Sequence, residues 1–143
     1  MNTSYEKIYK IFLNKITDYD LGLLSDNELL LFCDSVFLSA ITKIKSFDMN
    51  NLTDRDDDLR IFNSELTDVE CEVIASQMVV EWVDRKINTT QLIHMFVGTK
   101  DESMASQANH IKLLLELKEK QRSIVSIMMR DAKYKAWIEE GIQ

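Results

Sequence analysis

Proline is absent from this chain, and only three of its 143 residues are glycine. A sandwich or barrel of many short strands needs a turn every few residues, and turns are rich in proline and glycine. Because proline and glycine are so scarce here, we expect long helices joined by short polar connections. We therefore expect an all-α fold, a helical bundle of about four to five helices with a long C-terminal helix. Residues 1–143 are enough for one domain with a single core.

Three segments carry the pattern of a capping box, in which a Ser or Thr is followed three residues later by Glu. They begin at Thr3, Ser25 and Thr67. In a capping box the hydroxyl and the carboxylate each accept a hydrogen bond from a backbone N–H group at the start of a helix. Apolar residues follow each box at helical spacing, so three helices are predicted to begin there. The first is expected to end near residues 17–24.

The later helices are separated by weaker signals. The longest polar connection covers residues 46–64, with a short helical turn expected around Asp57 to Phe62. The third helix is expected to keep Trp82 in the core and to stop at Asn88. A short fourth helix follows and is closed by Gly98, a residue typical of helix C-terminal caps.

The fifth helical segment runs from about Glu102 to Glu140 without a helix breaker. At about 1.5 Å per residue it would be on the order of 55 Å long, longer than the body of a domain this size. The stretch KEKQRS, residues 118–123, contains no apolar residue and divides it. The first half is expected to bury Met104, Ala105, Ala108, Ile111, Leu114 and Leu115.

The second half of this helix, residues 123–143, is a candidate docking segment that projects from the body or bends back. Large apolar side chains on a projecting element commonly mark an interface. For Trp137, a place in the core is an equally good interpretation. The candidate interface residues are Ile124, Ile127, Met128, Tyr134, Trp137 and Ile138.

The net charge of −7 and the estimated pI of 4.8 argue against two classes of partner. Affinity for nucleic acid comes from Lys and Arg that displace counterions from phosphates, and attraction to anionic lipid needs the same sign. No stretch approaches the roughly 20 apolar residues of a membrane span, and the N-terminus lacks the pattern of a secretion signal. We expect a soluble protein made in a cytoplasm, without membrane or sequence-specific nucleic-acid binding.

No catalytic or cofactor-binding motif is found, so no enzymatic activity is expected. His94 and His110 have no acidic or cysteine partner at the spacing of a zinc site. Cys33 and Cys71 lie alone in apolar helical patterns and are expected to be small core residues, although a disulfide between them stays open.

One acidic cluster matches part of a calcium-binding loop. Counted from Asp54, the acidic residues Asp54, Asp56, Asp58 and Glu65 fall at positions 1, 3, 5 and 12 of such a loop. Position 6, which needs glycine for a sharp turn, is Leu59. These departures favour a solvated acidic loop over a calcium site.

Three stretches of the chain carry a resemblance. They are LTDRDDDLRIFNSELTDVE from Leu52 to Glu70, MVVEW from Met78 to Trp82, and SQANHIKLLLELKEK from Ser106 to Lys120. They resemble small helical proteins encoded beside portal and capsid genes in tailed phages of Gram-positive bacteria. The relatives are head–tail connector, or neck adaptor, proteins.

This resemblance implies a structural protein of the virion neck, made in the bacterial cytoplasm. Such adaptors form a ring, commonly of twelve copies, that joins the DNA-filled head to the tail. The implied partners are the portal protein, other neck or tail-completion proteins and further copies of the chain. DNA would pass through the channel of the ring, and the last helix would dock on the portal.

Two other functions also fit the sequence. One is a small acidic helical regulator that binds a single host or phage protein through exposed methionines and Trp137. The other is a calcium-responsive module built on Asp54, Asp56, Asp58 and Glu65.

Overall fold

The computed structural model describes residues 2–16, 21–44, 52–97 and 101–141. For residues 90–97, 101–107, 132–137 and 139–141 the description covers the backbone alone. The described chain is mostly helical, as predicted, and adds a small three-stranded sheet. The helices are α1 (Tyr5–Lys15), α2 (Asp26–Ile44), α3 (Asp68–Val97) and α4 (Asp101–Gly141), with a 3₁₀ turn η1 (Leu21–Leu23).

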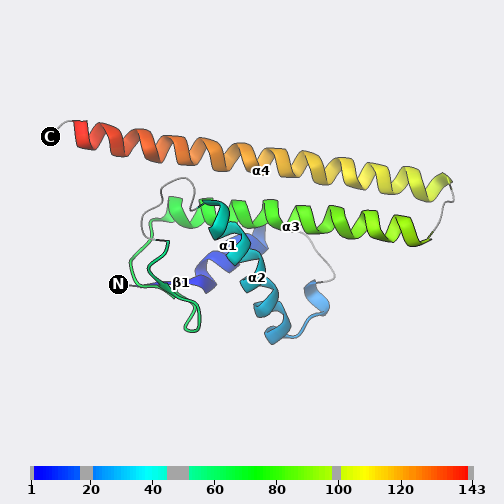
Figure 1. Ribbon diagram of the computed structural model, residues 1–143, viewed down its shortest axis with the longest axis horizontal. Coiled ribbons are helices and arrows are strands. Elements are labelled where there is room, and N and C mark those ends of the chain that lie inside the picture. The colour runs from blue at the N-terminus through cyan, green and yellow to red at the C-terminus, as the bar shows by residue number, and fades with distance from the viewer. Residues whose placement is uncertain (1, 17–20, 45–51, 98–100, 142–143) are drawn as a thin grey trace.

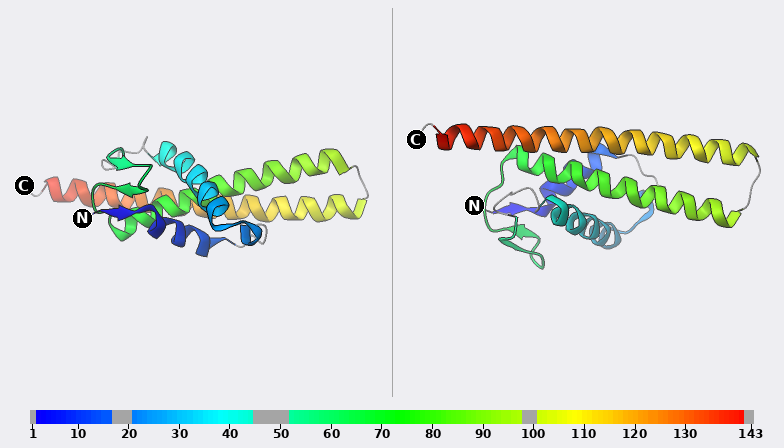
Figure 2. Two further views of the ribbon diagram at one scale, coloured as in Figure 1. Left: turned by 90° about the horizontal axis from the view of Figure 1, so that it is seen from below. Right: turned by 45° about the horizontal axis from the view of Figure 1, so that its top comes forward.

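Helix α3 lies in the middle of the molecule (Figure 1). Helix α4 runs antiparallel along one side of α3, and α1, α2 and the small sheet lie on the other side. The two further views agree that α3 and α4 run side by side (Figure 2). The molecule thus has a compact N-terminal body, made of α1, α2, the sheet and the adjoining part of α3, and a long two-helix arm.

The capping boxes at Ser25 and Thr67 are confirmed. The Ser25 N–H donates to Oε1 of Glu28 at 3.3 Å, and the Glu28 N–H donates back to Ser25 Oγ at 3.2 Å. Thr67 and Glu70 exchange the same two bonds at 3.0 and 3.1 Å. Helices α2 and α3 therefore begin where their local sequences predict.

The capping box predicted at Thr3 is wrong. Ser4 is the N-cap of α1, and its hydroxyl accepts from the Glu6 N–H at 3.2 Å. Thr3 lies in strand β1 (Thr3–Ser4), and its hydroxyl accepts from the buried N–H of Leu66 at 2.8 Å. A hydrogen bond between Thr3 and the segment before α3 therefore replaces the local bond that the capping box predicted.

The helical turn predicted around Asp57 to Phe62 is also wrong, because a β-hairpin occupies this region. Strands β2 (Arg55–Asp56) and β3 (Ile61–Phe62) are antiparallel, and β3 pairs with β1 on its other edge, with Thr3 opposite Phe62. Asp56 Oδ1 accepts from the N–H groups of Asp58 and Leu59, both at 3.0 Å, which closes the turn. Arg60 completes the reversal with a φ of 54°, a left-handed conformation unusual for a residue other than glycine.

Helix α3 continues through the predicted stop at Asn88. It has 30 residues, and the separate fourth helix expected from Gln91 to Phe96 is part of it. The Thr89 hydroxyl donates to the Arg85 carbonyl at 2.9 Å, one turn back along the helix. This bond lets a threonine sit inside a helix where the sequence favours a cap.

The core fills the space between α1, α2, α3 and the sheet. Its aromatic centre joins Tyr5, Phe37 and Phe62, with ring centroids 4.3 Å apart for Tyr5–Phe37 and 5.1 Å for Tyr5–Phe62. The segment from Met78 to Trp82 is buried along α3, so the core position predicted for Trp82 is confirmed.

Candidate interaction surface on the helical arm

Few of the described side chains of α4 are buried in its contact with α3. Among the described side chains of α4, only Leu114, Gln121 and Val125 are buried, with Leu114 and Val125 each 6% exposed. Leu114, Gln121 and partly buried Met128 are spaced by seven residues, the period of one stripe in a pair of packed helices. We call these residues, with Val125, the α4 seam.

The prediction for the first half of α4 is largely wrong. Ala108 and Leu115 are exposed and Ile111 is half-buried, so only Leu114 is buried as expected. The side chains of Met104 and Ala105 lie outside the described residues. The KEKQRS stretch, which contains no apolar residue, nevertheless contributes Gln121 to the seam, and Gln121 Oε1 has no hydrogen-bond partner within the described part of the chain.

A groove of about 690 Å³ lies beside the seam, between the end of α2, the middle of α3 and α4. Its apolar wall consists of Ile44, Val80, Val125 and Met129. Its polar lining consists of Lys43, Gln77, Asp84, Lys118, Arg122, Ser126 and Arg130. We call this feature the basic groove, because four of its lining residues are cations and one is an anion.

Two ion pairs fix the inner side of the groove. Lys118 Nζ lies 2.7 Å from Asp84 Oδ1, which ties α4 to α3. Lys43 Nζ lies 2.7 Å from Glu81 Oε1, which ties the end of α2 to α3. Arg122 contacts Glu119 of its own helix at 3.5 Å, and Arg130 has no ion pair with another described residue. The outer rim therefore carries positive charge that the described chain leaves weakly compensated.

The predicted interface residues do not form one exposed patch. Ile127 is 52% exposed, Ile124 and Ile138 are half-buried, and Met128 packs against the core. The side chains of Tyr134 and Trp137 lie outside the described residues. Because Val125 is buried and Met128 packs inward, the helix is still attached to the body at these positions, beyond the boundary of 123 expected from the sequence.

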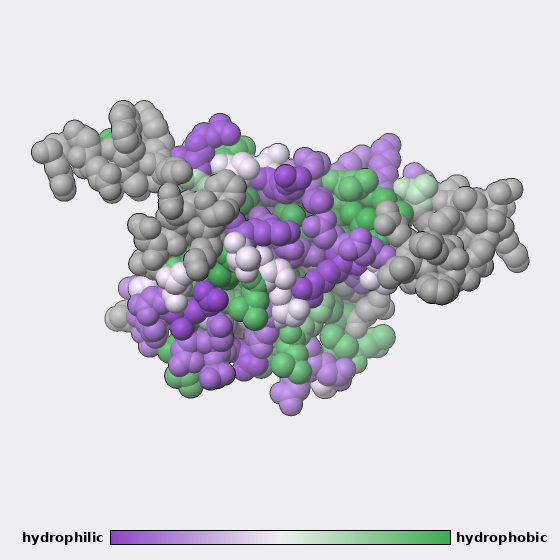
Figure 3. All heavy atoms as spheres, viewed as in Figure 1, coloured by the Kyte–Doolittle hydropathy of each residue, from purple (hydrophilic) through white to green (hydrophobic). Residues whose placement is uncertain are grey.

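Helix α4 nevertheless outruns its neighbour. It has 41 residues against 30 in α3, and its C-terminal end runs past the start of α3 (Figure 1). Among the described side chains of α4, Leu113, Leu115 and Ile127 are exposed apolar residues. In the face seen in Figure 3, hydrophobic residues form separate areas among hydrophilic ones. The arm thus offers single apolar anchors in a polar surface.

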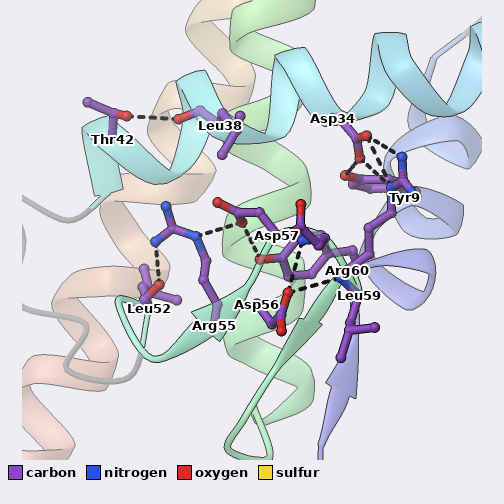
Figure 4. A network of polar contacts seen from close by, with 12 residues as sticks. Tyr9, Asp34, Leu38, Thr42, Leu52, Arg55, Asp56, Asp57, Leu59 and Arg60 are labelled. Carbon is purple, nitrogen blue, oxygen red and sulfur yellow. Dashed lines mark hydrogen bonds and ion pairs between the residues drawn. The ribbon is translucent and has the colours of Figure 1, made fainter.

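A polar network that the sequence did not predict holds the hairpin to the body (Figure 4). The Tyr9 hydroxyl donates to Asp34 Oδ1 at 2.6 Å, and the Arg60 guanidinium donates to both Asp34 oxygens at 2.7 to 3.1 Å. Tyr5 donates to Asp57 Oδ1 at 2.6 Å, and Arg55 donates to the same oxygen at 3.1 Å. Two Tyr–Asp–Arg sets therefore lie side by side. Their tyrosines, Tyr5 and Tyr9, are one turn apart on α1.

The network changes the proton affinities of its members. Burial opposes ionisation of Asp34, but hydrogen bonds from Arg60 and Tyr9 hold the pKa of its carboxyl below the ordinary value. Burial and the bond to Asp34 raise the pKa of Tyr9 well above that of a free tyrosine. Asp34 is therefore held as a carboxylate and Tyr9 as a neutral donor, which is the pairing that fixes the hairpin.

The four acidic residues with calcium-loop spacing have other roles or point to solvent. Asp56 closes the hairpin turn, and Asp54 accepts from the Asn63 side-chain amide at 2.8 Å. Asp58 and Glu65 are exposed. Among the described residues there is no cluster of three His, Cys, Asp or Glu side chains able to hold a metal ion.

Cys33 and Cys71 are both buried and both free, so no disulfide joins them. Burial raises the pKa of the Cys33 thiol to about 11 and raises that of Cys71 as well. His110 is exposed on α4, and the side chain of His94 lies outside the described residues. Both cysteines are therefore core residues, as the sequence predicts.

Within the described residues, no helix combines the length and the apolar character needed to cross a membrane. A scan against protein-family models found no match for this chain, and comparisons with curated proteins and with solved structures found none either.

Proposed function

We propose that this protein is a structural adaptor of the neck of a tailed-phage virion. In this role it forms a ring beneath the portal, joins the DNA-filled head to the tail and performs no chemistry of its own. The class comes from the resemblance of residues 52–70, 78–82 and 106–120 to head–tail connector proteins. The proposed partners are the portal protein, further neck or tail-completion proteins and other copies of the chain.

The observation that carries the proposal is the overhang of α4. A 41-residue helix packs along a 30-residue helix and continues beyond its start. An isolated helical end has no core of its own to bury it, and helices are stabilised mainly by tertiary packing. A docking partner that receives the end of α4 would supply that packing. This is the geometry expected of an element that reaches from one ring of proteins to the next.

The exposed apolar residues on the arm support the same role. Ile127 is on α4 and leaves about half of its surface in solvent. Interfaces concentrate their binding energy in a few such anchors surrounded by polar residues. The acidic balance of the chain also suits a channel wall along which DNA must slide without binding.

The test is binding of the purified chain to portal rings encoded in the same genome, followed by electron microscopy of the complex. We expect a ring of copies on the portal. Ile127→Glu should weaken binding at least tenfold, because a charge would replace an apolar anchor, a change of about 1.4 kcal/mol or more. Leu23→Glu is the matched control, because Leu23 is an exposed leucine on η1 and not on the arm.

Two results would contradict the proposal. One is an unmodified chain that binds no portal ring at any concentration tested. The other is equal weakening by Ile127→Glu and Leu23→Glu, which would show that neither surface is specific. Tight capture of one soluble host or phage protein in place of a portal would favour the alternative, a small helical regulator.

A further inference from the structure

The hairpin turn between β2 and β3 presents an apolar side chain among carboxylates. Leu59 is 68% exposed at this turn, and Asp57 and Asp58 precede it in the chain. The Asp58 carboxylate is exposed and makes no hydrogen bond or ion pair with another described residue. In the close view Leu59 points away from the network that anchors the hairpin (Figure 4). We call Asp57, Asp58 and Leu59 the acidic turn.

The basic groove has the complementary arrangement. An apolar wall that includes Ile44, Val125 and Met129 lies next to the cationic side chains of Arg122 and Arg130. Its volume of about 690 Å³ falls within the range of pockets that take a small-molecule ligand, which is ample for one leucine side chain. A leucine preceded by the exposed Asp58 carboxylate would place its apolar group on the wall and that charge against the rim.

We propose that the basic groove of one copy of this chain receives the acidic turn of a second copy. The turn lies in the N-terminal body, on the far side of α3 from α4, whereas the groove opens between α2, α3 and α4. The contact therefore joins two different surfaces and is head-to-tail. Such contacts produce a closed ring when the rotation between copies closes.

The local charges of the two surfaces are complementary, which supports a second copy as the occupant. The chain carries a net charge of −7, so two copies repel each other over most of their surfaces. The groove is a positive region on this acidic molecule, and the acidic turn is present in every copy. Repulsion elsewhere would select this one orientation. In naming another copy, the inference rests on the proposed function, since a neck adaptor works as a ring.

Disulfide trapping tests the contact directly. Leu59→Cys protein mixed with Ser126→Cys protein should form a mixed dimer under mild oxidation, because Ser126 lines the groove. Ser123→Cys is the matched control, an exposed serine of the same helix outside the groove lining. The native cysteines are buried and will not compete. We expect at least a tenfold faster cross-link with Ser126→Cys, in solution or on portal rings.

Charge reversal provides the second test. Asp58→Arg in the Leu59→Cys protein and Arg130→Glu in the Ser126→Cys protein should each slow the same cross-link about tenfold. A mixture of the two charge-reversed proteins should restore the original rate. Cross-linking by Ser123→Cys at the same rate as Ser126→Cys, or reversal without restoration, would overturn the inference.

Portal binding separates this inference from the proposed function. Suppose Arg130→Glu abolishes binding to portal rings, Asp58→Arg leaves it intact, and no cross-link forms. The groove would then hold an acidic segment of the portal, and the self-contact would be wrong while the adaptor role survived. A strong cross-link between chains that bind no portal would support the self-contact and contradict the adaptor role.

Discussion

The N-terminal body and the helical arm are built on different principles. In the body, the rings of Tyr5, Phe37 and Phe62 pack together and two Tyr–Asp–Arg sets tie the hairpin to the helices. In the arm, the described part of α4 buries only Leu114, Gln121 and Val125. The comparison teaches that the described buried contacts are concentrated in the body, whereas most of the described side chains of α4 stay exposed or half-buried.

The largest expected change in stability follows from the loss of an aromatic ring in the body. Phe37→Ala should lower the free energy of unfolding by about 4 kcal/mol, because a fully buried ring would leave a cavity against Tyr5 and Phe62. Denaturant unfolding monitored by circular dichroism measures the loss. The matched deletion in the seam, Leu114→Ala, should cost about 2 kcal/mol, the low end for such changes. Equal losses at the two sites would remove the distinction between body and arm.

A smaller effect, dependent on pH, is expected for Asp34→Asn. The pKa of Asp34 is lowered in the folded protein, so the unfolded chain binds the proton more readily. The stability that Asp34 contributes is therefore complete above its ordinary pKa of 3.8 and is lost as the pH falls through the lower folded value. The variant should be less stable than the native chain at pH 7 and nearly equal to it in strong acid.

Unfolding curves at several pH values between 2 and 7 would measure this convergence. Asp58→Asn serves as the control, since Asp58 is exposed and lies outside the network. A constant difference between the native chain and Asp34→Asn across the whole range would mean that Asp34 does not act through its charge.

The smallest expected effect has the opposite sign and lies in the seam. Gln121 is buried, and its Oε1 has no hydrogen-bond partner among the described residues. Gln121→Leu should raise stability by about 1 kcal/mol, because it removes an unsatisfied buried polar group. Protection of α4 amides against hydrogen exchange should rise with it. If stability falls instead, Gln121 is satisfied in solution, and the seam is more polar than we describe.

Two of the helix starts depend on local contacts alone. The boxes at Ser25 and Thr67 use partners three residues apart, so both helix starts were predictable. The uninterrupted α4 followed in the same way from the absence of breakers. The start of α1 was misplaced because the hydroxyl of Thr3 bonds to Leu66, a partner 63 residues away.

The candidate surface was only partly predictable. An overlong last helix was visible in the sequence, but its buried stripe was not, because Gln121 is polar and lies within KEKQRS. The groove depends on Lys43, Asp84 and Arg122 from three separate helices, and no spacing along the chain relates them. The hairpin network was missed for the same reason, since Arg60 and Asp34 are 26 residues apart.

Arg60 joins two helices that are made before it during synthesis of this chain. Its carbonyl accepts a bond from the Tyr5 N–H at 2.9 Å, and its guanidinium holds Asp34, so one residue completes both the start of α1 and the anchoring of α2. A chain emerging from a ribosome exposes α1 long before Arg60 arrives. Contacts between distant residues must wait for the loop between them to close. The first helix made is therefore among the last parts of the body to be secured, and until then its apolar face depends on whatever shields nascent chains.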